Sequence, residues 1–307
     1  MTLTSLFLTL QGALGQGVIW GIMAIGVFIS FRLLDFADLS VDGSLATGGC
    51  VAAVMMINGF PPIIAVLIAF FAGALTGAVT ALLNTHFKIP AILAGILTQL
   101  GLYSINLRIL GRSNQTLLKV DTLFKSVSKS LNISTQISIL LIGILFTVLI
   151  VWILYWFFGT EIGSAIRATG SNEQMVRALG VNTNTTKILA LMLSNGLVGI
   201  SGALIAQTQG SADVKMGIGA IVIGLASIII GESFFRKSKN FMLTLFAIVL
   251  GSVVYRVVVA LVLQLGLSTD DLKLFTAILV AIFLATPTLL AKKRQTSIYK
   301  QQVGGGK

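Results

Sequence analysis

Three carboxylates lie close together between two apolar segments, and they are the residues of this sequence best placed to do chemistry inside a membrane. Asp35, Asp38 and Asp42 are three and four positions apart, so a continuous helix would place them on one face. An ionised carboxylate near the centre of a bilayer costs about 2.5–3.5 kcal/mol on insertion scales. We therefore expect these side chains to line an aqueous mouth or gate, to pair with Arg32, or to cap the next helix, with Asp38 or Ser40 as the cap.

Further polar side chains interrupt the apolar segments. Glu232 ends a glycine-rich apolar run beside Arg236 and Lys237, with which it is expected to form an ion pair. Lipid offers no hydrogen-bond partner, so each buried amide or hydroxyl must bond to another helix or to a solute. The candidates for a transport pathway or its gate are Asp35, Asp38, Asp42, Ser44, Asn84, Gln99, Asn195 and Glu232.

The remaining reactive residue types are too few for a catalytic or metal site. His86 is the single histidine and Cys50 the single cysteine, so we predict no metal ligands, no internal disulfide and no Ser/His/Asp set. The sequence also lacks the Gly-x-x-x-x-Gly-Lys-Ser/Thr loop that binds nucleotide phosphates. The chain is therefore predicted to have no catalytic residue, and any ATP that drives it must be hydrolysed by another subunit.

The composition predicts a membrane protein. The 307 residues are 56% hydrophobic and 10% charged, with a mean hydropathy of +0.98, whereas soluble domains carry about 25% charged residues. The net charge of +11 comes from basic residues scattered at the ends of apolar runs, which argues against a nucleic-acid partner.

The apolar runs are long enough for a bundle of about eight to ten membrane-spanning helices, including short or broken ones. Residues 1–295 are predicted to form one all-α membrane domain and residues 296–307 a flexible tail. The second and seventh runs are short and rich in glycine, so we expect broken or tilted helices there. The runs cover residues 4–31, 41–58, 61–84, 90–110, 137–158, 188–208, 217–232, 240–263 and 272–290.

The distribution of basic residues favours a cytoplasmic C-terminus. Residues 32–40, 85–89, 159–187, 233–239 and 291–307 would share one side and hold 13 of the 21 Lys and Arg residues. The opposite side would hold seven, and Arg256 falls inside a span. The basic segment 111–136 on that opposite side argues against this arrangement, because basic residues favour the cytoplasmic side.

The largest polar insert, residues 159–187, predicts a short capped helix. Ser171 and Gln174 have the spacing of a capping box, and Gly180 can end the helix in a left-handed conformation. Met175, Val176 and Leu179 would share an apolar face, and Glu173 can pair with Arg177. Because so short a helix is marginal in water, we expect its apolar face to dock either on its own bundle or in a partner's groove.

This insert resembles the cytoplasmic loop of the permeases of bacterial ABC importers, in the branch that includes the branched-chain amino acid and ribose permeases. The resemblance continues into the next span, with Leu193, Gly199, Gly202 and Ala203. In the insert, it rests on Gly163, Arg167, Ala168, Gly170, Asn172, Ala178, Gly180 and Asn182.

The segment from Phe31 to Ser44 also resembles this family, in which the first span ends in an Asn/Asp-Phe-Ala type of motif. It departs from the branched-chain branch, which tends to have His-Gly soon after. The form Asp-Leu-Ser-Val-Asp-Gly-Ser is similar to importers associated with tryptophan and tyrosine uptake. The resemblance thus implies an aromatic amino acid first, other amino acids second, and nucleosides or sugars third.

The resemblance implies a multi-pass protein of the bacterial plasma membrane with several partners. Two cytoplasmic ATPase subunits would hold ATP and Mg, an extracytoplasmic binding protein or lipoprotein would deliver the solute, and a second permease copy or homologue would complete the pathway. The insert's helix would be the coupling helix that docks on an ATPase. The residues implied in that docking are Ser171, Asn172, Glu173, Met175, Val176, Arg177, Leu179 and Gly180.

Two other readings of the sequence stay open. An ion-gradient-driven secondary transporter would also be a glycine-rich bundle with a few intramembrane carboxylates. An intramembrane enzyme would need a nucleophile with a base, or metal ligands, at facing helical positions, and we find no such set.

Overall fold

The computed structural model describes residues 3–234 and 240–264, together with residues 274, 275, 277, 278, 280–282 and 285, and it gives side chains from residue 9 onward. Eight helices correspond to the first eight apolar runs, whereas the run 272–290 lies largely outside the described residues. Their bounds are α1 (Leu3–Phe28), α2 (Val41–Ile57), α3 (Pro62–Thr85), α4 (Ala91–Leu110), α6 (Thr135–Gly159), α9 (Thr183–Gln209), α10 (Ala220–Phe234) and α11 (Phe241–Gln264).

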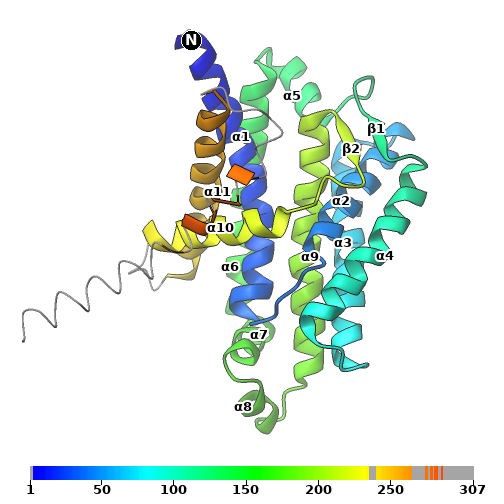
Figure 1. The fold of residues 1–307 in the computed structure, drawn as a ribbon, viewed down its shortest axis with the longest axis vertical. Coiled ribbons are helices and arrows are strands. Elements are labelled where there is room, and N and C mark those ends of the chain that lie inside the picture. Colours follow the sequence, from blue (N-terminus) through cyan, green and yellow to red (C-terminus); the bar gives the residue numbers. More distant parts are fainter. Residues whose placement is uncertain are drawn as a thin grey trace, which may run out of the picture.

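Six of these helices are long and apolar enough to cross a membrane, and they run roughly side by side (Figure 1). The predicted polytopic α-helical fold is confirmed. A π-helical turn, η1 (Ile29–Leu33), follows α1 directly. π-helical turns are rare and recur at functional sites.

The centre of the bundle is built on α9, which packs against α1, α2 and α3. Glycines allow these backbones to touch: Gly202 of α9 abuts the Leu45 carbonyl of α2, and Gly77 of α3 abuts the Leu191 carbonyl of α9. In lipid, close backbone approach and dispersion hold helices together, because apolar side chains gain little by leaving one apolar medium for another. Gly196, Gly199 and Gly202 of α9 all lie at close contacts with α2 or α3.

The short runs form intact helices. α2 has 17 residues and α10 has 15, so at 1.5 Å per residue α10 is about 22 Å long, shorter than the hydrocarbon core. Figure 1 shows α10 lying across the direction of the other helices. The prediction of a tilted helix is confirmed for α10, and the alternative of a broken helix is wrong for both runs within these bounds.

The two ends of the bundle carry different small elements. At one end, β1 (Asn114–Thr116) pairs antiparallel with β2 (Ser211–Asp213), beside helix α5 (Leu123–Leu131). At the opposite end lie α7 (Glu161–Ser171) and α8 (Glu173–Ala178) (Figure 1). The sequence did not predict the two strands, because three-residue segments are too short for a recognisable alternation.

Candidate functional site

The polar insert folds into two helices joined by one residue. Asn172 ends α7 and begins α8, and its Oδ1 accepts a hydrogen bond from the Met175 amide at 3.0 Å. The predicted cap at Ser171 is wrong: Ser171 is the last residue of α7, where its Oγ donates to the Arg167 carbonyl. The first backbone amides of a helix lack a partner within the helix, and an asparagine side chain can accept from one of them as well as a serine can. The residue in this role has an extended backbone, and here that residue is Asn172.

Gly180 ends α8 as predicted. It has a φ of +84°, and its amide donates to the Arg177 carbonyl while the Val181 amide donates to the Val176 carbonyl. A left-handed residue at this position is the usual way to satisfy the last carbonyls of a helix.

The predicted shared apolar face of α8 is wrong. Val176 is buried, but Met175 and Leu179 are 50% and 75% exposed. Met175 and Leu179 are four positions apart and share one face, whereas Val176 lies about 100° around the helix from Met175. One apolar side chain therefore anchors α8 to the bundle, and two are left on its outer surface.

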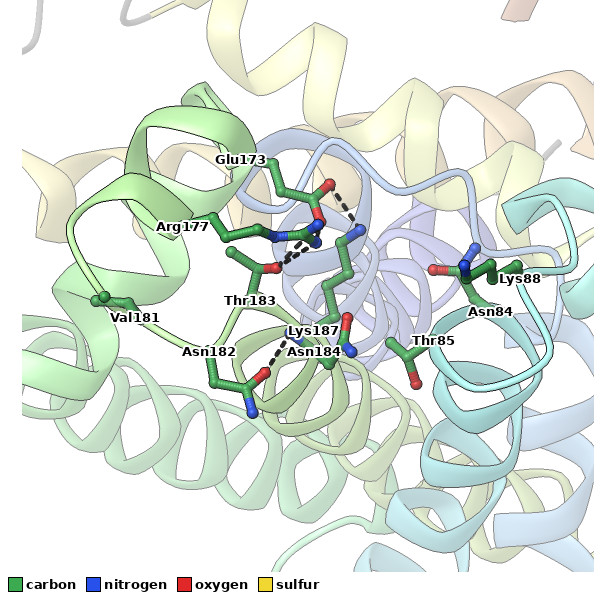
Figure 2. A pocket seen from close by; sticks show the side chains of 11 residues that line it. Asn84, Thr85, Lys88, Glu173, Arg177, Val181, Asn182, Thr183, Asn184 and Lys187 are labelled. Carbon is green, nitrogen blue, oxygen red and sulfur yellow. Dashed lines mark hydrogen bonds and ion pairs between the residues drawn. The ribbon is translucent and has the colours of Figure 1, made fainter.

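Glu173 ties α8 to the first turns of α9 (Figure 2). Its two carboxylate oxygens accept hydrogen bonds from Arg177 Nη2 and Lys187 Nζ, both at 2.8 Å. Thr183 Oγ1 donates to the same carboxylate and accepts from Arg177. The predicted Glu173–Arg177 pair is confirmed, whereas Thr183 and Lys187 were missed because they lie 10 and 14 positions from Glu173.

A polar cleft of about 620 Å³ lies beside this network. One wall is the start of α9 with residues of α8, and the other is the end of α3 with the turn before α4 (Figure 2). Lys88 of that turn has a φ of +55°, and Asn84 Nδ2 steadies the turn by donating to the Ile89 carbonyl. Asn84 thus shapes the turn, and its candidate role in the pathway is not supported by its contacts.

Acidification is expected to loosen α8 from α9. The hydrogen bond from Lys187 is the main reason that the pKa of the Glu173 carboxyl lies below its ordinary value; the Lys187 charge, Thr183 and Arg177 add to it, and partial burial opposes it. A carboxyl with a lowered pKa stabilises the folded state fully above its unfolded pKa and loses that contribution as the pH falls through the lowered value. Hydrogen-exchange protection of the α8 amides should therefore decrease as the pH is lowered in the acid range. Glu173→Gln should show weak protection that hardly changes with pH, and a pH response equal to that of the unmodified chain would contradict the assignment.

A second polar cluster lies inside the bundle, around Asp38. Its Oδ1 accepts from the Ser40 amide and hydroxyl at 2.8 and 2.6 Å, and its Oδ2 accepts from Asn195 Nδ2 at 2.7 Å. All three residues are fully buried. The structure therefore brings together two of the predicted pathway residues, Asp38 and Asn195, from segments far apart in the sequence.

Hydroxyl groups extend this cluster through α2, α3 and α4. Ser44 Oγ lies 2.5 Å from Thr76 Oγ1, and Thr80 Oγ1 donates to Thr98 Oγ1 at 3.0 Å. Because unsatisfied polar groups are costly in lipid, such pairs fix the relative positions of the helices. The sequence analysis did not identify these three threonines as part of a polar cluster. The only feature of the sequence that could have indicated them is a hydroxyl side chain within an apolar run.

The other predicted carboxylates lie apart from this cluster. Asp42 accepts from the Gly219 and Ile221 amides and so caps α10, whereas Asp35 is exposed with a φ of +54°. The expectation of one shared face for Asp35, Asp38 and Asp42 is wrong, because the helix ends at Leu33 and the next begins at Val41. The predicted cap of α2 by Asp38 or Ser40 is wrong: Ser40 precedes α2 without a side-chain capping hydrogen bond, and Asp38 accepts from the Ser40 amide, which lies before the helix.

Glu232 of α10 pairs with Arg32 of η1. The guanidinium Nε and Nη2 each donate to one carboxylate oxygen at 2.8 Å. Arg236 and Lys237, the predicted partners, lie outside the described residues. Gln99, the last candidate, is half-buried on α4 beside Gly43 of α2.

The sequence matches the protein family described as "Branched-chain amino acid transport system / permease component" over residues 9–287. That match spans most of the chain, including all of the helices described above except the first turns of α1. The chain belongs to this permease family.

Several curated relatives are similar to the permease over most of its length. It is 41% identical to the "Tyrosine transport system permease protein" of Clostridioides difficile (strain R20291), over 92% of each chain. An uncharacterized protein of Rickettsia prowazekii is 32% identical over 89% of this chain and 96% of its own. The ribose import permease protein of Escherichia coli K12 is 29% identical over 78% and 72%, respectively.

One solved structure matches this chain at low sequence identity. It is described as "PsaBC from Streptococcus pneumoniae in complex with Fab", with a TM-score of 0.47, 18% identity and 90% coverage of each chain.

Proposed function

We propose that this permease is the membrane-spanning subunit of an ATP-driven ABC importer that moves tyrosine or a similar aromatic amino acid into the bacterial cytoplasm. The single observation that supports the coupling role is α8: a capped two-turn helix at one end of the bundle, fixed on its inner side and apolar on its outer side. The substrate class follows from the relative that is 41% identical and is named for tyrosine transport.

The outer surface of α8 suits docking in a groove of a partner. Met175 and Leu179 are the two large apolar side chains exposed on this segment. A short helix that presents apolar anchors is a recurring way to enter a groove on another protein. We place the cytoplasmic ATPase subunits at this end of the bundle, with the C-terminus on the same side.

Hydrogen bonds at two points of α9 connect α8 to the intramembrane cluster. Lys187, which holds Glu173, lies eight residues before Asn195 on the same helix, about 12 Å along its axis. Asn195 in turn holds Asp38, between η1 and α2. Movement of α8 by an ATPase would therefore displace α9 and pull on Asp38, which is a physical means of shifting the bundle between outward-open and inward-open states.

Reconstitution can test the proposed function directly. The tagged permease purified from its native membrane should bring an ATPase subunit with it in a 1:1 ratio. Proteoliposomes that contain this complex and ATP, supplied with the system's binding protein, should take up labelled tyrosine. Leucine and ribose serve as comparison solutes, and an ion gradient without ATP serves as the control. Tyrosine uptake driven by the ion gradient alone, with no ATPase attached, would instead establish a secondary transporter.

A further inference from the structure

The chain between η1 and α2 is attached to α10 at two charged residues. Arg32, on η1, forms the two hydrogen bonds with Glu232 near the end of α10. Asp42, in the first turn of α2, accepts from the Gly219 and Ile221 amides at the start of α10. A single short stretch of chain therefore holds this crosswise helix at both of its ends (Figure 1).

This stretch of chain is long enough to follow α10 and is itself attached to α9. Gly219 and Glu232 are 13 positions apart, which is about 20 Å along a helix axis, whereas ten residues of extended chain reach about 33 Å. Residues 34–40 are not helical, and within them Asp38 is bonded to Asn195 of α9. A displacement of α9 is therefore passed to the stretch that holds α10.

The two attachments of α10 differ in how easily they can open. If Asp42 moved away, the backbone amides at the start of α10 would be left inside the bundle without a partner, which is costly in a membrane. The Arg32 side chain, in contrast, is 61% exposed, so water can solvate the two charged groups once they separate. Asp42 is therefore the fixed attachment, and the Arg32–Glu232 pair is the one that can open.

Between its two ends, α10 meets α1 only through apolar packing. Gly224 of α10 lies against the side chains of Met23 and Val27. Among the residues that the structure describes, the contacts at its two ends are the only hydrogen bonds or ion pairs that join α10 to another helix. Apolar surfaces lose little when they separate in an apolar medium, so the exposed ion pair decides whether the end of α10 stays beside α1.

The turn that carries Arg32 also touches the polar insert. Gly170 of α7 abuts the Leu33 carbonyl at the end of η1, where a Cβ would not fit. Asn172 then joins α7 directly to α8. A displacement of α8 therefore reaches η1 through α7, and it changes the position of Arg32 relative to Glu232.

We propose that α10 is a gate helix, which is hinged where Asp42 caps its start and is held closed at its other end by the Arg32–Glu232 ion pair. This inference rests on the proposed function, which places the ion pair toward the cytoplasmic face. Movement of α8 by the ATPase breaks the pair, the end of α10 leaves α1, and the solute is released on that side. Arg32 and Glu232 are thus positioning residues, which set the populations of the closed and open states without touching the solute.

Charge reversal and charge exchange test the ion pair in proteoliposomes that contain the permease–ATPase complex, ATP and the loaded binding protein of the same system. Arg32→Glu and Glu232→Arg each replace attraction by repulsion, and tyrosine uptake should fall at least about tenfold. The two reversals combined restore an attractive pair and should return uptake to within about threefold of the wild type. The control, Lys129→Gln, removes an exposed ion pair at the opposite end of the bundle and should leave uptake unchanged.

A cysteine under α10 reports on the separation of α10 from α1 without ATP or solute. Val27 is buried against α10, and the native Cys50 is buried as well. A water-soluble thiol reagent should therefore label Val27→Cys slowly. Adding Arg32→Gln should speed labelling at least about fivefold, and the exchanged pair should return it to the slow rate. Melting temperatures should stay close to that of the wild type, because exposed ion pairs add little stability.

Three outcomes would overturn the gate. They are normal uptake in both single reversals, failure of the exchanged pair to recover uptake although the protein melts normally, and equal labelling of Val27→Cys in all variants. A wild-type complex that binds no ATPase, or that takes up no tyrosine with ATP, would instead disprove the proposed function. The labelling rates would still judge the gate in that case, because they depend on neither ATP nor solute.

Discussion

Leu179→Asp is expected to abolish tyrosine uptake and solute-stimulated ATP hydrolysis while leaving the permease inserted and folded. Leu179, the residue that follows α8, is the more exposed of the two apolar anchors. Its backbone amide donates to the Met175 carbonyl, and a change of side chain leaves this hydrogen bond in place. A buried anchor at the centre of an interface commonly contributes about 2 kcal/mol or more to binding. A carboxylate in its place would have to be desolvated on docking, so the loss should exceed that of a truncation to alanine.

Two variants separate loss of the anchor from addition of charge. Leu179→Met keeps an apolar side chain and should retain coupling. Asn184→Asp adds the same negative charge to an exposed residue at the start of α9 and should also retain it. Stimulated ATP hydrolysis and uptake are measured in proteoliposomes, and normal values for Leu179→Asp would remove the coupling role from α8. Arg177→Asp would be a less specific test, because Arg177 lies in the Glu173 network and its loss would also disturb the fold of α8.

Gly202→Val is expected to prevent assembly of the bundle. A Cβ at position 202 would overlap the Leu45 carbonyl, and no flexible side chain is available to move away. Separating α2 from α9 would also disturb the Ser40–Asp38–Asn195 cluster between them. Overpacking usually costs about 1–3 kcal/mol and occasionally more, and a collision between two backbones belongs to the upper end of this range.

Gly101→Val is the matched control for this substitution. Gly101 also lies within a long helix, α4, but no atom lies within 4 Å of a Cβ placed there. Valine has the higher helix propensity of the two residues, so this variant should fold normally. Size-exclusion profiles and melting temperatures in detergent measure both effects. A Gly202→Val protein with a normal profile and melting temperature would show that α2 and α9 are not packed as described.

The sequence predicts the membrane domain well because lipid leaves few alternatives. Each of the first eight apolar runs is a helix, since a segment in hydrocarbon must satisfy its own backbone hydrogen bonds. The orientation in the membrane, the single-domain prediction for residues 1–295 and the tail at 296–307 remain predictions.

The site was only partly predictable, because its contacts depend on how the helices are packed. Sequence spacing predicted the Glu173–Arg177 pair, which lies within one helix, and identified Gly180 as the end of α8. It could not predict that Asp38 meets Asn195 157 positions away, or that Arg32 meets Glu232 200 positions away. The shared face of Asp35, Asp38 and Asp42 failed for a local reason: the chain between Leu33 and Val41 is not helical.

The cap that Asp42 provides to α10 couples position 42 to position 219 during divergence. The Gly219 amide reaches the carboxylate from a backbone with a φ of +87°, a conformation that favours glycine. Gly217 is constrained for a different reason: its Cβ would overlap the backbone carbonyl of residue 42, which stays in place whatever side chain that residue carries. A lineage that loses the aspartate should therefore still keep Gly217, and the joint presence of Asp42 and Gly219 can mark sequences that keep the crosswise helix.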